Sequence, residues 1–404
     1  MRVAMVHYWL VAMRGGEKVL EALLELFPQA DIYTHVYTPE AVSPSIRKHT
    51  VNTSFIQKLP FARRHYQKYV PLMPLALEQL DLRDYDLVIS SESGPAKGVL
   101  TSADSLHICY CHTPMRYLWD FYQDYLTEAG PLLRPLWRLV SHRLRQWDAL
   151  SSLRVDHFVA NSHNVAKRIA KHYRRQARVI HPPVDIEAFA PRDGFFPDPE
   201  DFYLFVGQLN AYKRADLAVE ACTHLNRRLT VVGDGPERGR LEKLAGPSVS
   251  FLGRLPAAEV ADLMRRCRAL LFPGEEDFGI VPVEALASGR PVIAYGRGGV
   301  LESVRHASSG WLFASQDVSS LSSAMEAFEA EASFFDPSSL ISQARRFSKK
   351  TFQNSFLTFL HDCRPEADFR PPVFLAADGC EIPKPVQADA ALPKPDRITA
   401  TGAD

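Results

Sequence analysis

The chain has 404 residues, of which 46% are hydrophobic and 23% are charged, and its formal net charge is zero. This is ordinary globular composition with enough length for two domains and two cores, and the neutral balance gives no indication of nucleic-acid binding. No apolar run approaches the roughly 18 residues of a membrane span, and the first strand begins too early for a signal peptide, so we expect a cytoplasmic protein.

The first half of the chain alternates short apolar strands with helical stretches. The strands are predicted at residues 2–8, 31–36, 86–90 and 106–111. This alternation predicts a parallel, doubly wound sheet. Gly15 and Gly16 separate the first strand from a helix at 17–26, and they let the backbone approach a ligand closely. The alternative interpretation is a plain strand-to-helix turn.

His112 directly follows the strand predicted at 106–111. In an open parallel sheet, a side chain at the carboxyl end of a strand faces the crevice in which ligands bind. We therefore treat His112 as a candidate functional residue. The alternative is a histidine whose hydrogen bonds serve only the fold.

Two segments, 55–73 and 132–153, mix Arg and Lys with aromatic side chains. Basic amphipathic segments of this kind bind anionic membrane surfaces, and Trp137 or Trp147 would insert at the interface. The alternatives are a site for a pyrophosphate-linked lipid, or helices packed on the sheet with a solvated basic face. Two such segments in one half favour a domain that faces the cytoplasmic membrane.

A second set of strands follows a structural break. Pro, Val and Asp at 182–185 interrupt regular structure, and residues 193–201 are typical of a linker. A second sheet is then predicted from strands at 203–206, 229–232 and 249–252. An amphipathic helix is expected at 347–361, and the Pro- and Ala-rich sequence from residue 365 onward predicts a disordered tail.

Lys213 lies in the turn between the strand at 203–206 and a helix predicted at 215–225. A lysine at such a turn is placed to neutralise a diphosphate, and the positive end of the helix dipole adds to its effect. The alternative is a solvated lysine at the start of a helix.

The stretch 270–299 predicts a strand, an acidic turn, a helix at 280–287 and a second strand at 292–295. Glu276 in the turn and Glu284 in the helix are placed to face one crevice, where carboxylates accept hydrogen bonds from vicinal hydroxyls. The free N–H groups at the helix start favour an anionic or oxygen-rich ligand. The alternative is a surface acidic turn that caps an ordinary helix.

The two glutamates eight residues apart, the Phe-Gly pair after the first, and the sequence EALASGRPVIA resemble family 4 of the retaining GT-B glycosyltransferases. The resemblance implies an α/β GT-B fold, with two Rossmann-like doubly wound domains facing across a cleft. It covers roughly residues 1–363. The expected parts are an acceptor-binding domain (1–185), a linker (186–201), a nucleotide-sugar-binding domain (202–345), a helix returning to the first domain (346–363) and the tail (364–404).

The resemblance also implies roles for single residues. Glu276 would hold sugar hydroxyls, Glu284 the ribose, His112 the donor sugar near its 6-position, and Lys213 the diphosphate. His112, Lys213 and Glu276 are the catalytic candidates. Further contacts with the sugar donor are implied for Gly15, Gly16, Gln208, Arg214, Gly233, Gly235, Arg254, Leu255, Asp277, Phe278, Gly279 and Ile280.

One position departs from the family pattern, since Gln208 stands where the family commonly has an arginine. Glutamine can hydrogen-bond a phosphate but carries no charge. Arg214 is the candidate that would compensate for the missing charge.

The implied reaction is retaining transfer on one face of the sugar, through an oxocarbenium-like ion pair, with the departing phosphate assisting the incoming hydroxyl. No Asp-x-Asp pair lies beside a cluster of metal-ligating residues, so we expect a metal-independent reaction without a cofactor. Within the family, the chain most resembles bacterial mannosyltransferases of surface polysaccharide and O-antigen assembly. These imply GDP-mannose as sugar donor and a polyprenyl-diphosphate-linked oligosaccharide as acceptor, at the inner face of the cytoplasmic membrane. The alternatives are a GT-B nucleotide-sugar 2-epimerase and a non-catalytic nucleotide-sugar-binding protein.

Overall fold

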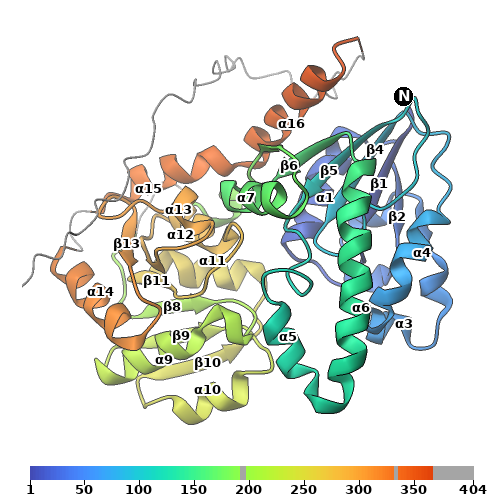
Figure 1. Ribbon diagram of the computed structural model, residues 1–404. Helices are drawn as coiled ribbons and strands as arrows, with labels where there is room; N and C mark the ends of the chain where they lie inside the picture. Colours follow the sequence, from blue (N-terminus) through green and yellow to red (C-terminus); the bar gives the residue numbers. More distant parts are fainter. Residues whose placement is uncertain (192–196, 332–334, 367–404) are drawn as a thin grey trace, which may run out of the picture.

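The computed structural model describes residues 1–191, 197–331 and 335–366, which form two parallel β-sheets with helices packed around them (Figure 1). The first sheet has seven strands in the order β3-β2-β1-β4-β5-β6-β7, and the second has six in the order β10-β9-β8-β11-β12-β13. The order reverses beside β1 and beside β8, which makes each sheet doubly wound with its own switch point for ligands. The predicted α/β class with two Rossmann-like units is confirmed.

The first unit contains β1 to β7 and α1 to α7. Its strands are β1 (Val3–His7), β2 (Asp31–Thr34), β3 (Val51–Thr53), β4 (Leu87–Glu92), β5 (Leu106–Cys111), β6 (His157–Ala160) and β7 (Ala177–Val179). Its helices are α1 (Gly15–Leu26), α2 (Pro44–Arg47), α3 (Ala62–His65), α4 (Met73–Glu78), α5 (Tyr122–Glu128), α6 (Gly130–Ser151) and α7 (His163–His172). β1 and β4 are buried along their whole length, as expected where helices cover both faces of a parallel sheet.

The second unit contains β8 to β13 and α8 to α15. Its strands are β8 (Tyr203–Val206), β9 (Leu229–Val232), β10 (Val249–Gly253), β11 (Ala269–Phe272), β12 (Val292–Tyr295) and β13 (Gly310–Phe313). Its helices are α8 (Ile186–Phe189), α9 (Ala215–His224), α10 (Arg238–Leu244), α11 (Ala257–Arg266), α12 (Ile280–Ala287), α13 (Val300–Ser303), α14 (Val318–Glu331) and α15 (Pro337–Ala344). The helix and strand expected at 280–287 and 292–295 are both present with those limits.

The last described helix, α16 (Lys349–Cys363), connects the second unit to the first (Figure 1). Its buried side chains Phe352, Phe356 and Leu360 pack in the core formed around β1 and α1. Gln353 also donates from Nε2 to the carbonyl of Ala22 at 3.1 Å. The chain therefore returns to the first sheet after completing the second.

Two expected segments fall partly outside the described residues. Within the expected linker, residues 186–189 form α8, and Ile186 and Phe189 pack in a core of the second unit. Residues 192–196 of the linker, and the tail from 367 onward, lie outside the part of the chain that the structure describes. The domain limits therefore stay predictions.

Helix α6 contains most of the basic segment 132–153. Of the two tryptophans expected to insert at a membrane interface, Trp137 or Trp147, the structure rules out Trp147. The indole of Trp147 packs so closely on Gly98 that a Cβ there would collide with it. Trp147 thus faces the apolar clusters of the first unit and is not available to insert into a membrane. The segment 55–73 is not one amphipathic helix, since it divides into α3 and short 3-10 helices on either side of it.

Candidate active site

The acidic turn between β11 and α12 lies against the turn before α9. The Glu276 carboxylate forms an ion pair with Nζ of Lys213. The close approach requires a glycine at 274, because a Cβ there would lie 2.9 Å from the Cα of Lys213. Burial lowers the pKa of Lys213, but the Glu276 carboxylate and Tyr212 together raise it more, so the net pKa lies above the ordinary value. Lys213 is therefore a fixed positive charge at the switch point of the second sheet.

Glu284 lies in α12 with its side chain almost buried, and it faces the first unit. Its Oε1 is 3.5 Å from Nζ of Lys18, which projects from α1. Burial raises the pKa of Glu284, and the positive charges of Lys18 and Lys213 partly oppose that rise. Because Lys213 acts on both glutamates, the structure brings Glu276, Glu284 and Lys213 together, as the sequence predicted.

Asp277 joins the two units. Its carboxylate pairs with Arg168 of α7, and its Oδ2 lies 3.5 Å from Nη1 of Arg116. Its carbonyl accepts a hydrogen bond from Ser162 Oγ at 2.6 Å. Burial raises the pKa of Asp277, whereas the two arginines lower it in part. The carboxylate that was expected to contact the sugar donor is thus already engaged with the first unit.

The remaining residues of the acidic stretch shape the backbone. Phe278 is buried and its ring packs near His181 and Phe347, so only its backbone faces the turn. Gly279 has a φ of +85° as the N-cap of α12, a conformation that favours glycine. The first N–H groups of a helix have no intrahelical partner, so those of Ile280 and Val281 are candidates to face a ligand, whereas Pro282 has no N–H.

The glycine loop of the first unit meets α12. A Cβ at Gly15 would lie 2.9 Å from Cδ1 of Ile280, so the start of α1 packs directly against the start of α12. A Cβ at Gly16 would lie 2.6 Å from the hydroxyl oxygen of Tyr8. Both glycines are needed for close packing, and this packing places two helix N-termini side by side.

The turns after β8 and β9 also pack on each other. Gly233 has a φ of +136°, and a Cβ there would collide with the carbonyl of Gly207. Gly235 similarly lies against the carbonyl of Leu209. These contacts fix the loop that carries Gln208, whose side chain is exposed.

Arg214 is directed away from this loop. Its guanidinium pairs with Asp216 at 3.1 Å, and Nη1 donates to the carbonyl of Gln316 at 3.2 Å. These partners occupy the side chain that was expected to replace the missing charge at Gln208. Arg116 of the first unit also has an acidic partner, Asp277, but its positive charge acts on Lys213 and its Nε is buried without a hydrogen-bond partner among the described residues.

His112 ends a hydrogen-bonded chain that crosses three strand ends. Its Nε2 lies 2.9 Å from Ser91 Oγ, and the same hydroxyl lies 3.1 Å from Nδ1 of His7. Nε2 of His7 lies 3.5 Å from Oε1 of buried Glu17. Burial lowers the pKa of His112 to about 3, with a smaller contribution from His7, so the imidazole is neutral at pH 7.

These contacts favour one tautomer of His112. A His7 imidazole with its single proton on Nε2, on the side of Glu17, presents Nδ1 as an acceptor. Ser91 then donates to that Nδ1, and its oxygen accepts from Nε2–H of His112. The remaining Nδ1 of His112 is consequently a bare acceptor, suited to a hydroxyl group of a ligand.

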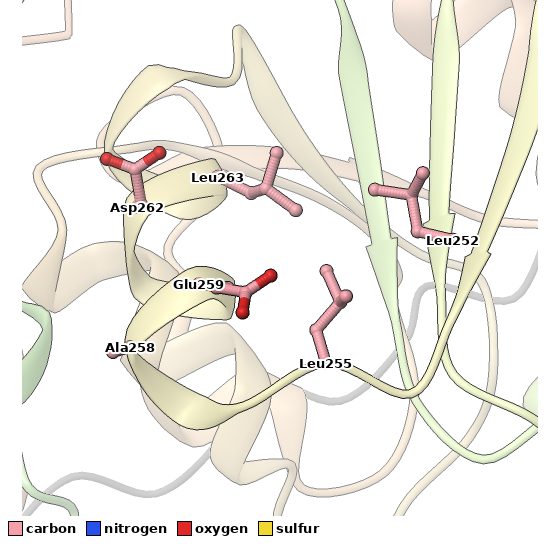
Figure 2. Close-up of a pocket in the computed structure, with 6 residues that line it drawn as sticks. All are labelled: Leu252, Leu255, Ala258, Glu259, Asp262 and Leu263. Atoms are coloured by element: carbon pink, nitrogen blue, oxygen red, sulfur yellow. The ribbon is translucent and has the colours of Figure 1, made fainter.

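A pocket of 510 Å³ lies between the end of β10 and α11 (Figure 2). Leu252, Leu255 and Leu263 converge on it, and the Glu259 carboxylate points into it (Figure 2). Leu255 was an expected contact of the sugar donor, whereas its neighbour Arg254 is exposed and does not line the pocket. The pocket combines apolar walls with a hydrogen-bond acceptor.

Several residues of this region were missed by the sequence analysis. Ser91 and His7 lie at the carboxyl ends of β4 and β1, so the rule that selected His112 would also have selected them. Lys18, Arg116 and Arg168 carry no such signal. They are recognised only because the fold brings them to acids of the second unit.

Comparisons with known proteins agree on one family. The model described as Glycosyltransferase Family 4 matches residues 13–188, and the model described as Glycosyl transferases group 1 matches residues 186–350. The D-inositol 3-phosphate glycosyltransferase of Streptomyces bingchenggensis is 33% identical over 188 residues, which are 39% of this chain and 41% of that protein. The chain therefore matches less than half of that relative's length. Human alpha-1,3/1,6-mannosyltransferase ALG2 is 27% identical over 335 residues, 72% of this chain and 77% of that protein.

Solved structures share the fold. Sucrose-phosphate synthase from Thermosynechococcus elongatus has a TM-score of 0.67 at 16% identity, covering 91% of this chain and 100% of that one. Anabaena HepE in complex with UDP has a TM-score of 0.66 at 16% identity, covering 90% of this chain and 100% of that one. At this identity the similarity establishes the architecture alone.

Proposed function

Because the chain belongs to the group 1 glycosyltransferases of family 4 and has their GT-B fold, we propose that it is a retaining mannosyltransferase. The proposed sugar donor is GDP-mannose, and the proposed acceptor is a polyprenyl-diphosphate-linked oligosaccharide of bacterial surface polysaccharide synthesis. The observation that carries the proposal is the pairing of Lys213 with Glu276 beside Glu284, at the switch point of the second sheet. The mannosyltransferase name of the human relative supports the choice of sugar.

The site's charges suit departure of a nucleoside diphosphate. In this proposal Lys213 moves its interaction from Glu276 toward the diphosphate, where negative charge develops as the glycosidic bond breaks. Glu276 is then free to accept hydrogen bonds from the sugar hydroxyls, while Glu284 accepts from the ribose. Backbone N–H groups at the start of α12 add donors for the phosphate oxygens. No metal or cofactor enters this scheme.

Arg116 is proposed to supply the positive charge that Gln208 lacks. Its guanidinium lies over the ring of Phe121 at 3.9 Å and 5.6 Å from the ring centroid of Tyr212, next to Lys213. Arg116→Ala should therefore lower kcat/KM by about tenfold or more, as expected for loss of a charged hydrogen bond of about 1.5–3 kcal/mol. Arg214→Ala is the matched control and should have a much smaller effect. The reverse order would assign the compensating charge to Arg214.

The pocket at β10 and α11 is proposed to hold the base. A guanine presents N1–H and N2–H2 as neighbouring donors, and the Glu259 carboxylate can accept from both. Uracil offers only one donor on the corresponding edge. Glu259→Gln should thus weaken the binding of GDP more than the binding of UDP, as measured by calorimetry. Equal losses of affinity for both nucleotides would show that the base does not bind in this pocket.

Membrane binding is proposed for an exposed stripe on α6. No helix within residues 1–191, 197–331 and 335–366 is long and apolar enough to cross a membrane. However, Leu132, Leu136 and Leu139 recur along one face of α6, with 93%, 59% and 60% of their surfaces exposed. This face lies opposite the one that packs on the sheet, and exposed Arg143 continues it. An apolar stripe with basic neighbours fits the surface of an anionic bilayer, near a lipid-linked acceptor.

Product analysis tests the activity. The protein should transfer mannose from GDP-mannose only when lipid-linked acceptor is present, and UDP-glucose should be a poor substitute. A free epimerised sugar formed without acceptor would instead indicate a 2-epimerase, and tight donor binding without turnover would indicate a binding protein. Preference for UDP-glucose would contradict the proposed sugar donor.

Cosedimentation with anionic vesicles tests the membrane surface separately. Wild-type protein should bind, and salt should suppress binding, because attraction between charges falls off within about 8 Å at physiological ionic strength. A variant with Arg63, Arg64, Arg138 and Arg143 changed to Glu should not bind but should keep its nucleotide affinity. Equal vesicle binding by both proteins would contradict the proposal.

A further inference from the structure

Three side chains that can ligate a metal gather where the two units meet, away from the acidic turn's own ion pairs. His163 begins α7, His181 follows β7, and Glu302 lies in α13 of the second unit. One potential ligand atom from each of the three lies within 4.8 Å of the other two. We propose that His163, His181 and Glu302 form a binding site for a divalent transition-metal ion, which bridges the two units.

The distances are close to those that a metal requires. Oε2 of Glu302 lies 2.9 Å from Nδ1 of His163 and 2.8 Å from Nε2 of His181. An ion about 2.0–2.1 Å from nitrogen and oxygen ligands places them about 3.3 Å apart in a tetrahedral site, or about 2.9 Å apart at right angles. A separation of a few tenths of an ångström between Glu302 and each imidazole would admit the ion, and the two imidazole nitrogens, which lie within 4.8 Å of each other, would move closer together around it. The side chain of His163 is 71% exposed and can make that movement.

The surroundings hold two of the ligands in place. The His181 ring lies 5.4 Å from the ring of Phe278 and 5.1 Å from that of Phe347, between centroids. The Glu302 carboxylate also accepts from the backbone N–H of Asn164 at 3.4 Å through Oε1. Ligands oriented in this way lose little conformational freedom when they bind an ion.

The chemistry of the three ligands selects the class of ion. Two imidazoles and one carboxylate suit zinc and similar divalent transition metals, whereas magnesium and calcium prefer oxygen ligands alone. Without a metal, the imidazoles donate to Glu302. Because a metal takes the place of hydrogens on its ligands, the ion would replace the hydrogens that the imidazoles share with Glu302.

Such an ion would restrain relative movement of the two units. Two ligands belong to the first unit and one to the second, so binding favours the arrangement in which all three meet. The inference does not depend on the sugar donor proposed above. It also explains why the sequence predicted no metal site, because the ligands come from three separate segments without metal-ligand spacing.

Zinc titration of the full-length protein tests the site. Isothermal titration calorimetry should show one saturable Zn²⁺ site per chain, and Zn²⁺ should raise the melting temperature. Glu302→Gln and His163→Ala should each abolish saturable binding and the shift, and the exposed position of His163 makes loss of folding a poor explanation. His172→Ala is the matched control, because His172 also lies on α7 and faces Asp120 at 3.4 Å.

Two outcomes would overturn the inference. Wild-type protein without saturable Zn²⁺ binding would show that the cluster is only a hydrogen-bonded contact between the units. Equal binding by wild type, Glu302→Gln and His163→Ala would place the ion on other surface groups. Neither result would bear on glycosyl transfer, which is measured separately.

Discussion

Replacing Ser91 with alanine tests whether the buried chain behind His112 matters for transfer. Ser91 is the only hydroxyl between the two imidazoles in that chain, at 2.9 Å from His112 and 3.1 Å from His7. Without it, Nε2–H of His112 loses its acceptor and the opposite tautomer becomes competitive. In that tautomer Nδ1 carries a hydrogen and no longer accepts from a sugar hydroxyl.

The expected magnitude follows from one hydrogen bond. A typical intramolecular hydrogen bond contributes about 1 kcal/mol net, which corresponds to about fivefold in kcat/KM. The hydroxyl that the family resemblance assigns to His112 is the one at the 6-position of the sugar. A 6-deoxy sugar donor lacks this hydroxyl, so its turnover should hardly respond to Ser91→Ala. The preference for the natural donor over the 6-deoxy donor should therefore fall by about fivefold.

Ser90→Ala provides a matched control on the same strand. Ser90 is equally buried and its Oγ lies 3.0 Å from Nε2 of His107, but that pair lies on the other face of the sheet. Both variants should lose about 1–3 kcal/mol of stability, because each leaves a buried imidazole nitrogen unpaired. Only Ser91→Ala should change the donor preference and the nitrogen NMR shifts of His112. An unchanged preference together with an unchanged tautomer would refute the reasoning.

Three further predictions concern binding and stability. Glu284→Ala should weaken binding of the free nucleoside diphosphate in calorimetry more than it lowers turnover at saturation, and unchanged affinity would remove Glu284 from the ribose. Lys97→Met should cost about 3–5 kcal/mol in urea unfolding, because two carboxylates fully buried around Lys97 lose their counter-charge; a loss below about 1 kcal/mol would contradict this. His35 and His107 are buried, and burial lowers the pKa of each to about 4. Because the unfolded chain binds protons on both from about pH 6.5 downward, stability should fall between pH 6.5 and 4, by about 2 kcal/mol per histidine at pH 5. A flat thermal-melting profile over that range would exclude neutral buried imidazoles.

Much of the fold could be predicted from local pattern. Strands of a parallel sheet are apolar on both faces, and turn residues mark their ends, so β11, α12 and β12 were expected within a residue of their observed limits. Lys213, Glu276 and Glu284 follow from the same reasoning, because the carboxyl ends of strands are where ligands bind. Local pattern therefore predicted the doubly wound fold and the meeting of these three side chains, whose roles stay predictions.

What could not be predicted depends on contacts between distant segments. Trp147 has the composition of an interfacial residue, yet the fold packs it on Gly98. Arg214 follows Lys213 directly, yet Asp216 and Gln316 occupy its guanidinium. In both cases a neighbour that is close only in space decides the role of the side chain.

The acidic turn shows why contacts between the units matter for function. Glu276 faces Lys213 within the second unit, but the next residue, Asp277, pairs with Arg168 of the first. Arg168 also donates from Nη1 to Thr113, the residue after His112, at 3.3 Å. The acidic turn thus contacts both Lys213, the predicted diphosphate contact, and the arginine that holds the residue beside His112, the predicted sugar contact. A rearrangement of the two units that breaks these contacts is therefore expected to change the distance between His112 and Glu276, the two residues predicted to hold the sugar.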